Sequence, residues 1–299
     1  MRILFCSDPL DKRQADSAYA AEASAAKEAG FDIGLVNFEA LVYENDARQA
    51  VRAITAAPTP EQALYRGWML TGDQYGSLYE ALLARNVVLI NDPAQYLFAH
   101  SLPENYAVIA PLTPQTVWLA WDGDAFSKLP TLLRPFGSGP LILKDYVKSR
   151  KHEWHEACFI PSASDMEAVN RVVTTFVRRQ GDDLNGGLVF REFVPYQPLA
   201  EHPQSGMPLT KEFRVFFLDA APVFVTPYWD EGDYAAETPP LESFLEIARQ
   251  VQSRFFTMDV AQRIDGEWMI VELGDGQVAG LPERADLGEF YAALSTRIS

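Results

Sequence analysis

The stretch 257–277 contains acidic residues whose spacing could support metal and phosphate chemistry. Asp259 lies in one short apolar segment and Glu272 near the end of another, with Asp265 and Gly266 between the two segments. Asp-Gly pairs suit tight hairpin turns, so we expect two neighbouring strands here. A carboxylate within an apolar strand carries a desolvation cost that a cation can offset. Such a pair could hold Mg²⁺ beside phosphates, and a surface hairpin with solvated acids is the alternative.

Cationic residues gather at 144–151. Lys144 ends an apolar run, and Lys148, Arg150 and Lys151 follow shortly after it. A lysine at the end of a strand is most often a solvated edge residue. In this chain, however, the cations cluster in one loop despite a large excess of acids, and polyphosphate would favour such a loop.

Two further charged residues, Glu212 and Arg214, lie in a run of aromatic and β-branched residues, KEFRVFFL, which indicates a strand at 211–218. Because side chains alternate along a strand, Glu212 and Arg214 point to the same face. From the residues alone, an ion pair on the solvent face and a functional role both remain open.

Composition defines the broad class of the protein. Of 299 residues, 25 are Lys or Arg and 41 are Asp or Glu, and the formal charge of −16 disfavours nucleic acid, whose phosphates reward basic residues. No apolar run approaches the roughly 20 residues of a membrane-spanning helix. The N-terminal MRILFCSDP reaches Asp8 too soon for a signal-peptide core. The two cysteines, Cys6 and Cys158, are too few for a disulfide framework or a zinc pattern. We therefore expect a cytoplasmic protein without membrane or nucleic-acid partners.

The order of the expected elements is that of an α/β protein with an α+β C-terminal part. Strands at 2–6 and 31–38 flank a helix at 17–30, a βαβ opening that is typical of a parallel sheet. The first turn lacks G-x-G-x-x-G, so we do not expect a dinucleotide. Further strands are expected at 63–70, 87–90, 116–119, 141–144, 188–194, 211–218 and 223–226, and helices at 76–85, 165–179 and 241–255. The intervening loops at 195–210 and 228–240 are long for simple connections.

This order of parts resembles the ATP-grasp superfamily, and in particular its carboxylate–amine ligases. The resemblance covers about residues 1–290 and implies three units, an N-terminal pre-ATP-grasp domain at 1–110, a small lysine-bearing subdomain at 111–190 and a larger subdomain at 191–299. It is carried above all by Asp259 and Glu272, since the family has an acid and a glutamate at this separation on neighbouring strands.

The metal site that the resemblance implies departs from the family in one position. The family glutamate often stands in an E-x-N motif, whereas Gly274 occupies the third position here, followed by Asp275, Gly276 and Gln277. The resemblance implies Asp259, Glu272 and Asp275 as Mg²⁺ ligands, with Asp275 or Gln277 replacing the missing ligand.

The resemblance also implies a nucleotide site. Lys144 resembles the family lysine that contacts the nucleotide phosphates, LVFREFV at 188–194 resembles the hinge beside adenine, and Glu212 with Arg214 matches the family E-F-R strand. The implied ATP-binding residues are Lys144, Lys148, Glu192, Phe193, Val194 and Glu212. Another family lysine is expected near 99–102, where this chain has His100.

What the resemblance implies is an ATP-dependent ligase that forms an amide bond through an acyl phosphate, with ATP and Mg²⁺ as cofactors. Glu272 and Arg214 are the expected catalytic residues, Arg214 holding the transferred phosphoryl group or the tetrahedral oxyanion. We expect small-molecule or peptide carboxylates and amines as substrates, and a homodimer is one assembly that the sequence leaves open. A small-molecule kinase and a nonhydrolysing ATP-binding module remain alternatives, the latter because of His100 and Gly274.

The two long loops are the expected acceptor pocket, because they leave the strands nearest the implied site. In the loop 228–240, Tyr228 and Trp229 could form flat apolar walls. The acids that could attract the ammonium of an amine substrate are Asp230, Glu231 and Asp233. The alternative is a solvated acidic loop.

Overall fold

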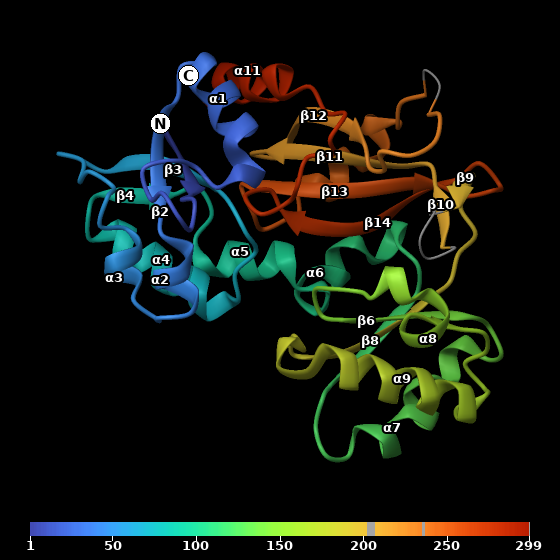
Figure 1. Ribbon diagram of the computed structural model, residues 1–299. Coiled ribbons are helices and arrows are strands. Elements are labelled where there is room, and N and C mark those ends of the chain that lie inside the picture. The colour runs from blue at the N-terminus through green and yellow to red at the C-terminus, as the bar shows by residue number, and fades with distance from the viewer. Residues whose placement is uncertain (202–206, 235–236, 299) are drawn as a thin grey trace.

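A computed structural model describes residues 1–201, 207–234 and 237–298. Within these ranges the strands form three four-stranded sheets and one two-stranded ribbon, and helices cover the sheets (Figure 1). None of the helices in the described residues has both the length and the apolar character needed to cross a lipid bilayer. The predicted fold class, α/β with an α+β C-terminal part, is confirmed.

The first sheet is parallel, with strand order β2-β1-β3-β4. Its strands are β1 (Arg2–Cys6), β2 (Asp32–Val36), β3 (Glu61–Arg66) and β4 (Val87–Leu89). The helix predicted between the first two strands is α1 (Ala20–Glu28), preceded by a short 3-10 turn, so the predicted βαβ opening is confirmed. The predicted strand at 63–70 ends earlier, because Thr71 begins a capping box for α4 (Gly72–Leu83).

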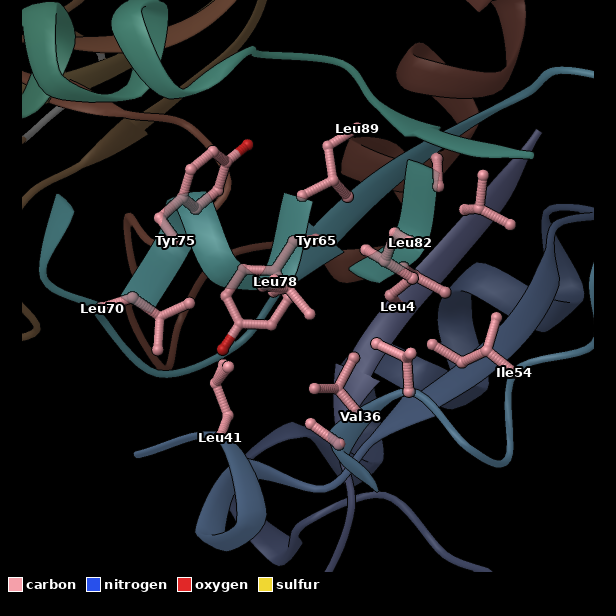
Figure 2. Packing of buried hydrophobic residues seen from close by; sticks show 14 of the residues in the cluster. Leu4, Val36, Leu41, Ile54, Tyr65, Leu70, Tyr75, Leu78, Leu82 and Leu89 are labelled. Atoms are coloured by element: carbon pink, nitrogen blue, oxygen red, sulfur yellow. The ribbon is translucent and has the colours of Figure 1, made fainter. Parts of the chain in front are cut away.

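A buried cluster holds the first sheet to its helices. Figure 2 shows Leu78 and Leu82 of α4 packed toward Leu4, Tyr65 and Leu89 of the sheet. The other helices of this part are α2 (Phe38–Val42), α3 (Ala47–Ala50), α5 (Pro93–His100) and α6 (Leu102–Ile109). α5 and α6 lead from the first sheet toward the second (Figure 1).

The second sheet is antiparallel, with strand order β5-β8-β6-β7. Its strands are β5 (Thr116–Ala120), β6 (Leu141–Asp145), β7 (Phe159–Ile160) and β8 (Gly187–Glu192), and its helices are α7 (Ala125–Leu132), α8 (Trp154–Ala157) and α9 (Met166–Gln180). The apolar stripe of α9 is buried against this sheet, as its spacing predicts. The hinge strand predicted at 188–194 is β8, which ends at Glu192, so Phe193 and Val194 lie just beyond the strand.

The third sheet is antiparallel, with strand order β12-β11-β13-β14. Its strands are β11 (Glu212–Leu218), β12 (Ala221–Pro227), β13 (Phe255–Gln262) and β14 (Trp268–Asp275). The predicted hairpin is confirmed, with Gly266 in its turn at φ +95° and Asp259 directly opposite Glu272.

The predicted helix at 241–255 is wrong in its second half. A 3-10 turn and α10 (Leu245–Ala248) occupy the first half, and β13 begins at Phe255. Phe255 and Phe256 of β13 are fully buried, so packing in the sheet prevails over the helical pattern there. The expected loop at 195–210 contains the ribbon of β9 (Pro198–Glu201) and β10 (Pro208–Thr210), and 202–206 lie outside the described residues.

A C-terminal helix, α11 (Leu287–Ile298), packs on α1 and β12 and was not predicted (Figure 1). Near it, the buried Arg66 donates to both carboxylate oxygens of Glu22 at 3.0 Å, and Tyr291 donates to Glu22 at 2.7 Å. The first and third sheets thereby share one buried cluster. The three sheets fall in the three predicted units, although β8 crosses the boundary drawn after residue 190, and the boundaries remain a prediction.

Candidate functional site

The centre of the candidate site is an ion pair within the third sheet. Arg214 on β11 lies opposite Asp259 on β13, and its Nε and Nη2 donate to the two carboxylate oxygens at 2.8 and 2.7 Å. Asp259 is only 1% exposed, and its burial raises the pKa of the carboxyl, against which Arg214 acts. Arg214 therefore pairs with Asp259 and not, as in the alternative left open by the sequence, with Glu212 on a solvent face, and Asp259 is not a solvated acid of a surface hairpin.

A second ion pair joins the second and third sheets. Lys144 at the end of β6 donates its Nζ to Glu272 Oε2 at 2.9 Å. Burial opposes the ionisation of Glu272, but the positive charges of Lys144 and Lys151 lower its pKa to about 2. Lys144 is only 6% exposed, so it is not the solvated edge residue of the alternative reading.

One face of the third sheet carries all of these charges. Side chains alternate along the strands, so Glu212 and Arg214 of β11 point the same way, as do Asp259 and Glu272 on the neighbouring strands. The residues between them pack into a buried core on the opposite face, namely Phe213, Val215, Phe217, Met258 and Leu273. The apolar alternation of these strands thus positions the predicted site residues.

Glu212 is the most isolated acid of this face. It is 3% exposed, and its Oε1 has no hydrogen-bond partner among the described residues. Burial, together with the charges of Asp259 and Glu272, raises the pKa of Glu212 to about 7 against the opposing effect of Lys151. A buried acceptor without a partner is costly, so this oxygen is a candidate contact for a bound ligand.

Lys151 is a site residue that the sequence indicated only as one member of a cationic loop. Its ammonium lies over the rings of Tyr228 and Trp229, with 5.1 and 5.4 Å to the two centroids. Burial opposes its charge, but Tyr228 and Glu212 raise its pKa above the ordinary value. Arg150 of the same loop turns away from the site and donates to Gln180 and Glu153.

Two cavities meet at these residues. The first, of about 430 Å³, is lined among others by Arg214, Asp259, Lys148 and His100. The second, of about 290 Å³, is lined by many apolar residues, by the predicted hinge residues Glu192, Phe193 and Val194, and by Lys144 and Glu212. Lys151 and Glu272 line both cavities, so the structure brings the predicted phosphate-binding and hinge residues to one place.

His100 lies at the end of α5, in the wall of the first cavity. Its ring stacks on Tyr96 with 5.1 Å between centroids. Burial lowers the pKa of His100 to about 4, and the nearby charges of Lys144 and Lys148 act in the same direction. The imidazole is therefore neutral at pH 7.

Asp275 lines the first cavity with Asp259 and Glu272, but its carboxylate does not share their face of the sheet. Strand alternation places its side chain on the opposite face from Glu272. There the carboxylate accepts hydrogen bonds from Asn91 Nδ2 at 2.6 Å and from the backbone of Gln277 at 2.9 Å. The first of these contacts joins β14 to Asn91, which follows β4 of the first sheet.

A third cavity, of about 380 Å³, continues from the first past Arg214, Tyr228 and Trp229. The Arg214 guanidinium lies 4.7 Å from the centroid of the Tyr228 ring, so the ring has cations on two sides. Asp230 and Glu231 line this third cavity, and Asp230 accepts a hydrogen bond from the backbone of Arg284. Residues 235–236 of the same loop lie outside the described residues.

The donor set fits Mg²⁺ that arrives with phosphates. Among the described residues, no group of three or more His, Cys, Asp or Glu side chains could hold a metal ion alone. Mg²⁺ does not require such a cage, because one or two carboxylates, phosphate oxygens and waters suffice. The buried Asp259 and the half-buried Glu272, directly opposite each other beside a cationic cavity, supply those carboxylates.

Comparisons with known proteins agree with this geometry. A family model described as an ATP-grasp domain, R2K clade family 3, matches residues 135–294, which is more than half of the chain. No sequence among the curated proteins matches the chain.

Solved structures share the fold over the whole length. They include the D-cycloserine synthetase DcsG, with 14% identity, a TM-score of 0.62 and 100% of both chains covered. A RimK domain ATP-grasp protein from Sphaerobacter thermophilus has 13% identity, a TM-score of 0.60 and 99% of this chain and 98% of that chain covered. The ATP-grasp ligase PsnB, complexed with minimal precursor, Mg and ADP, has 13% identity, a TM-score of 0.58 and 99% of this chain and 97% of that chain covered. At such identities the likeness shows the fold, and together with the family match it confirms the predicted resemblance. The chain belongs to the ATP-grasp domain family of the R2K clade, family 3.

Proposed function

We propose that this protein is an ATP-dependent carboxylate–amine ligase that forms an amide bond through an acyl phosphate. The observation that carries the proposal is the meeting of two cavities at Lys151 and Glu272. One cavity has the apolar walls and hinge backbone suited to adenine, and the other has the guanidinium and carboxylates suited to phosphoryl transfer. Family and fold support an ATP-grasp ligase at the coarse level, and the two cavities support the finer chemistry.

The nucleotide would lie in the second cavity, with its phosphates at the junction. We assign adenine contacts to the hinge, Glu192 with the backbone of Phe193 and Val194, which line this cavity. Phosphate contacts are assigned to Lys144, Lys148 and, in addition to the predicted set, Lys151. The Oε1 atom of Glu212 is buried and has no hydrogen-bond partner among the described residues. It would contact the nucleotide or the ammonium group of Lys151 beside it.

Mg²⁺ would be held by Asp259 and Glu272, and when bound it would offset the charge on the phosphates. Asp275 was predicted as a third ligand, but its carboxylate already accepts hydrogen bonds from Asn91 and Gln277 on the other face of the strand. We therefore assign the metal to the first two residues. The solved PsnB complex contains Mg and ADP, which supports the same cofactors here.

The reaction would proceed in two steps. A carboxylate oxygen of the acceptor attacks the γ-phosphorus of ATP, and ADP leaves. The amine nitrogen then attacks the acyl carbon, inorganic phosphate leaves with its bonding pair, and the nitrogen loses a proton. Arg214 donates from Nε and Nη2 to Asp259 and from Nη1 to the carbonyl of Gly280. One N–H on each of Nη1 and Nη2 is then left to donate to the phosphoryl group or the oxyanion.

Substrates would enter through the first and third cavities, which continue into each other beside Tyr228 and Trp229. We propose a small-molecule or peptide carboxylate and an amine. The precursor bound by PsnB and the precursor peptide bound by the macrocyclase MdnC support the peptide option for proteins of this fold.

The test is a panel of amino acids and dipeptides assayed for ATP-dependent phosphate release, with mass spectrometry of the products. A ligase releases ADP and phosphate only when carboxylate and amine are both present, and yields the mass of the amide. ADP release without an amine, with phosphate retained on a product, identifies a small-molecule kinase. Nucleotide binding without ADP or AMP across the panel identifies a nonhydrolysing module.

A further inference from the structure

Beside the acid pair, Thr257 on β13 lies directly opposite Gly274 on β14. Each is two residues along its strand from Asp259 or Glu272, so strand alternation puts all four positions on one face. Both Thr257 and Gly274 line the first cavity. The Thr257 side chain, which bears a hydroxyl group, therefore lies next to the candidate metal site.

Thr257 occupies the space that a side chain at position 274 would need. A Cβ atom added to Gly274 would lie 2.8 Å from Thr257 Oγ1, closer than such atoms approach in practice. The threonine side chain has only χ1 with which to move aside, and its rotamers are restricted. With threonine at 257, the site therefore has no room for a longer oxygen-bearing side chain at 274.

The Thr257 side chain is poised for a ligand. Thr257 is 1% exposed and lines the first cavity, and its Oγ1 lies beside the empty side-chain position of Gly274. A buried hydroxyl usually has a partner. The neighbouring positions of this face carry the carboxylates of Asp259 and Glu272, which pair with Arg214 and Lys144.

We propose that the Thr257 hydroxyl is an oxygen ligand of the Mg²⁺ ion assigned to Asp259 and Glu272, in place of a side chain at position 274. The proposal rests on the proposed function. Hydroxyl oxygens of Ser and Thr are established Mg²⁺ ligands at phosphate sites. A neutral ligand also suits this face, because Asp259 and Glu272 already repel a third carboxylate, that of Glu212.

The experiment measures Mn²⁺ affinity by electron paramagnetic resonance, with the nonhydrolysable analogue AMPPNP present and Mn²⁺ standing in for Mg²⁺. Thr257→Val keeps the shape of the side chain and removes the oxygen. We expect it to weaken Mn²⁺ binding by about tenfold or more, the loss seen even when groups that only orient metal ligands are removed. Thr257→Ser keeps the oxygen and should bind Mn²⁺ as the wild type does.

An unchanged Mn²⁺ affinity in Thr257→Val overturns the proposal, and so does an equal loss in Thr257→Val and Thr257→Ser. Melting temperatures of both variants separate metal binding from packing, since a purely structural threonine would change the melting temperature without changing the Mn²⁺ affinity of the folded protein.

A coupled exchange gives an independent check. Thr257→Ala creates the space that Asn needs at 274, so Thr257→Ala/Gly274→Asn should bind Mn²⁺ more tightly than Thr257→Ala alone. Equal affinities contradict the shared ligand position. Glu272→Gln separates a failure of the role of Thr257 from a failure of the metal site itself. If it weakens Mn²⁺ binding and Thr257→Val does not, only the role of Thr257 fails, whereas no effect of either substitution refutes the metal site of the proposed function.

Discussion

At the residue scale, the site consists of carboxylates that are each held by a cation. Asp259 pairs with Arg214, Glu272 pairs with Lys144, and the unpartnered Glu212 lies beside Lys151. A buried charge without a partner is costly, so these pairs keep the face charged while no ligand offsets it. Phosphates would provide the cations with other anions, and Mg²⁺ would provide the carboxylates with another cation.

Glu272→Gln is expected to lower turnover by at least about 100-fold, comparable with removing one preorganised charge at other active sites. The amide loses most of the attraction to Mg²⁺ and to Lys144, whereas its volume is unchanged. Phosphate release with the accepted substrate measures the effect. Glu267→Gln, an exposed acid at the start of the same hairpin strand, is the control and should leave turnover near wild type. Near-wild-type turnover of Glu272→Gln would refute the metal assignment.

Lys144→Ala is expected to weaken ATP binding by about tenfold, or about 1.4 kcal/mol, because the second cavity, to which we assign the nucleotide, loses a cation. The melting temperature should change much less than the affinity. Calorimetric titration of ATP measures the first and thermal unfolding the second. Lys128→Ala removes an exposed lysine that pairs with Asp122 on the far side of the second sheet, and it should change neither. If ATP affinity is the same in both variants, Lys144 only holds the sheets together.

Residue types and spacing were enough to predict some of these contacts. Asp259 and Glu272 could be predicted as site residues because they are acids in apolar strands, and Lys144 because it ends an apolar strand. The role of Lys151 could not be predicted, because it depends on a loop of the second sheet reaching the aromatic rings that follow β12. The relation of Thr257 to Gly274 depends on the strand register, which the sequence left undetermined.

At the element scale, the third sheet was the part most open to prediction. Aromatic and β-branched residues in period two indicate β11, β12 and β13, and their bounds differ from the expected ones by a few residues. The helix expected at 241–255 fails after Ala248, since its apolar spacing is also compatible with a buried strand. In the loop 228–240, aromatic and acidic residues were expected beside a substrate, and Tyr228, Trp229, Asp230 and Glu231 do line cavities.

Neutralising Asp230, Glu231 and Asp233 together, as Asp230→Asn/Glu231→Gln/Asp233→Asn, is expected to raise the Michaelis constant for the amine several-fold, or about 1 kcal/mol. The reason is that the third cavity loses negative charge, whereas the second cavity, to which we assign the nucleotide, is lined by none of these acids. Steady-state kinetics with amine and ATP varied in turn measures both constants.

The control is a triple substitution of three exposed acids on the second sheet's side, Glu167→Gln/Asp182→Asn/Asp183→Asn, which changes the net charge by the same amount. It should leave both Michaelis constants unchanged. If the loop variant shifts only the constant for ATP, or neither constant, the loop does not receive the amine.

At the scale of the whole molecule, the N-terminal unit is bound tightly to the third sheet. Arg66 donates to the carbonyls of Gly276 and Ala279 at 2.8 and 2.7 Å, which fixes the segment that follows β14. Val278, Ala279 and Gly280 of that segment line the first cavity. The sequence predicted three successive units but not this joint core, because α11 and the Glu22–Arg66 pair become neighbours only in the folded chain.

The buried Asp275 makes this joint sensitive to pH. Burial raises the pKa of Asp275 to about 7, above the value of about 3.9 in an unfolded chain. Between these values the folded state binds a proton that the unfolded state releases, so the stabilisation is complete below pH about 4 and is lost as the pH rises through about 7. Asp275→Asn is therefore expected to lose less stability than the wild type over this pH range.

Urea unfolding of both proteins across the range from pH about 4 to about 7 measures the difference in slope. Asp182→Asn, an exposed acid, is the control for the loss of one charge and should follow the wild type. Parallel pH profiles for the wild type and Asp275→Asn would show that Asp275 is ionised throughout in the folded protein.

The central claim is that a carboxylate is activated as an acyl phosphate at the junction of the two cavities. The most direct test labels the carboxyl groups of the amino acid and dipeptide panel with ¹⁸O and follows the label during ATP-dependent amide formation. Attack of the carboxylate on the γ-phosphorus predicts that one ¹⁸O atom passes to the released phosphate, as read by mass spectrometry, and that the product has the mass of the amide. Phosphate released without ¹⁸O while the amide forms would contradict the account.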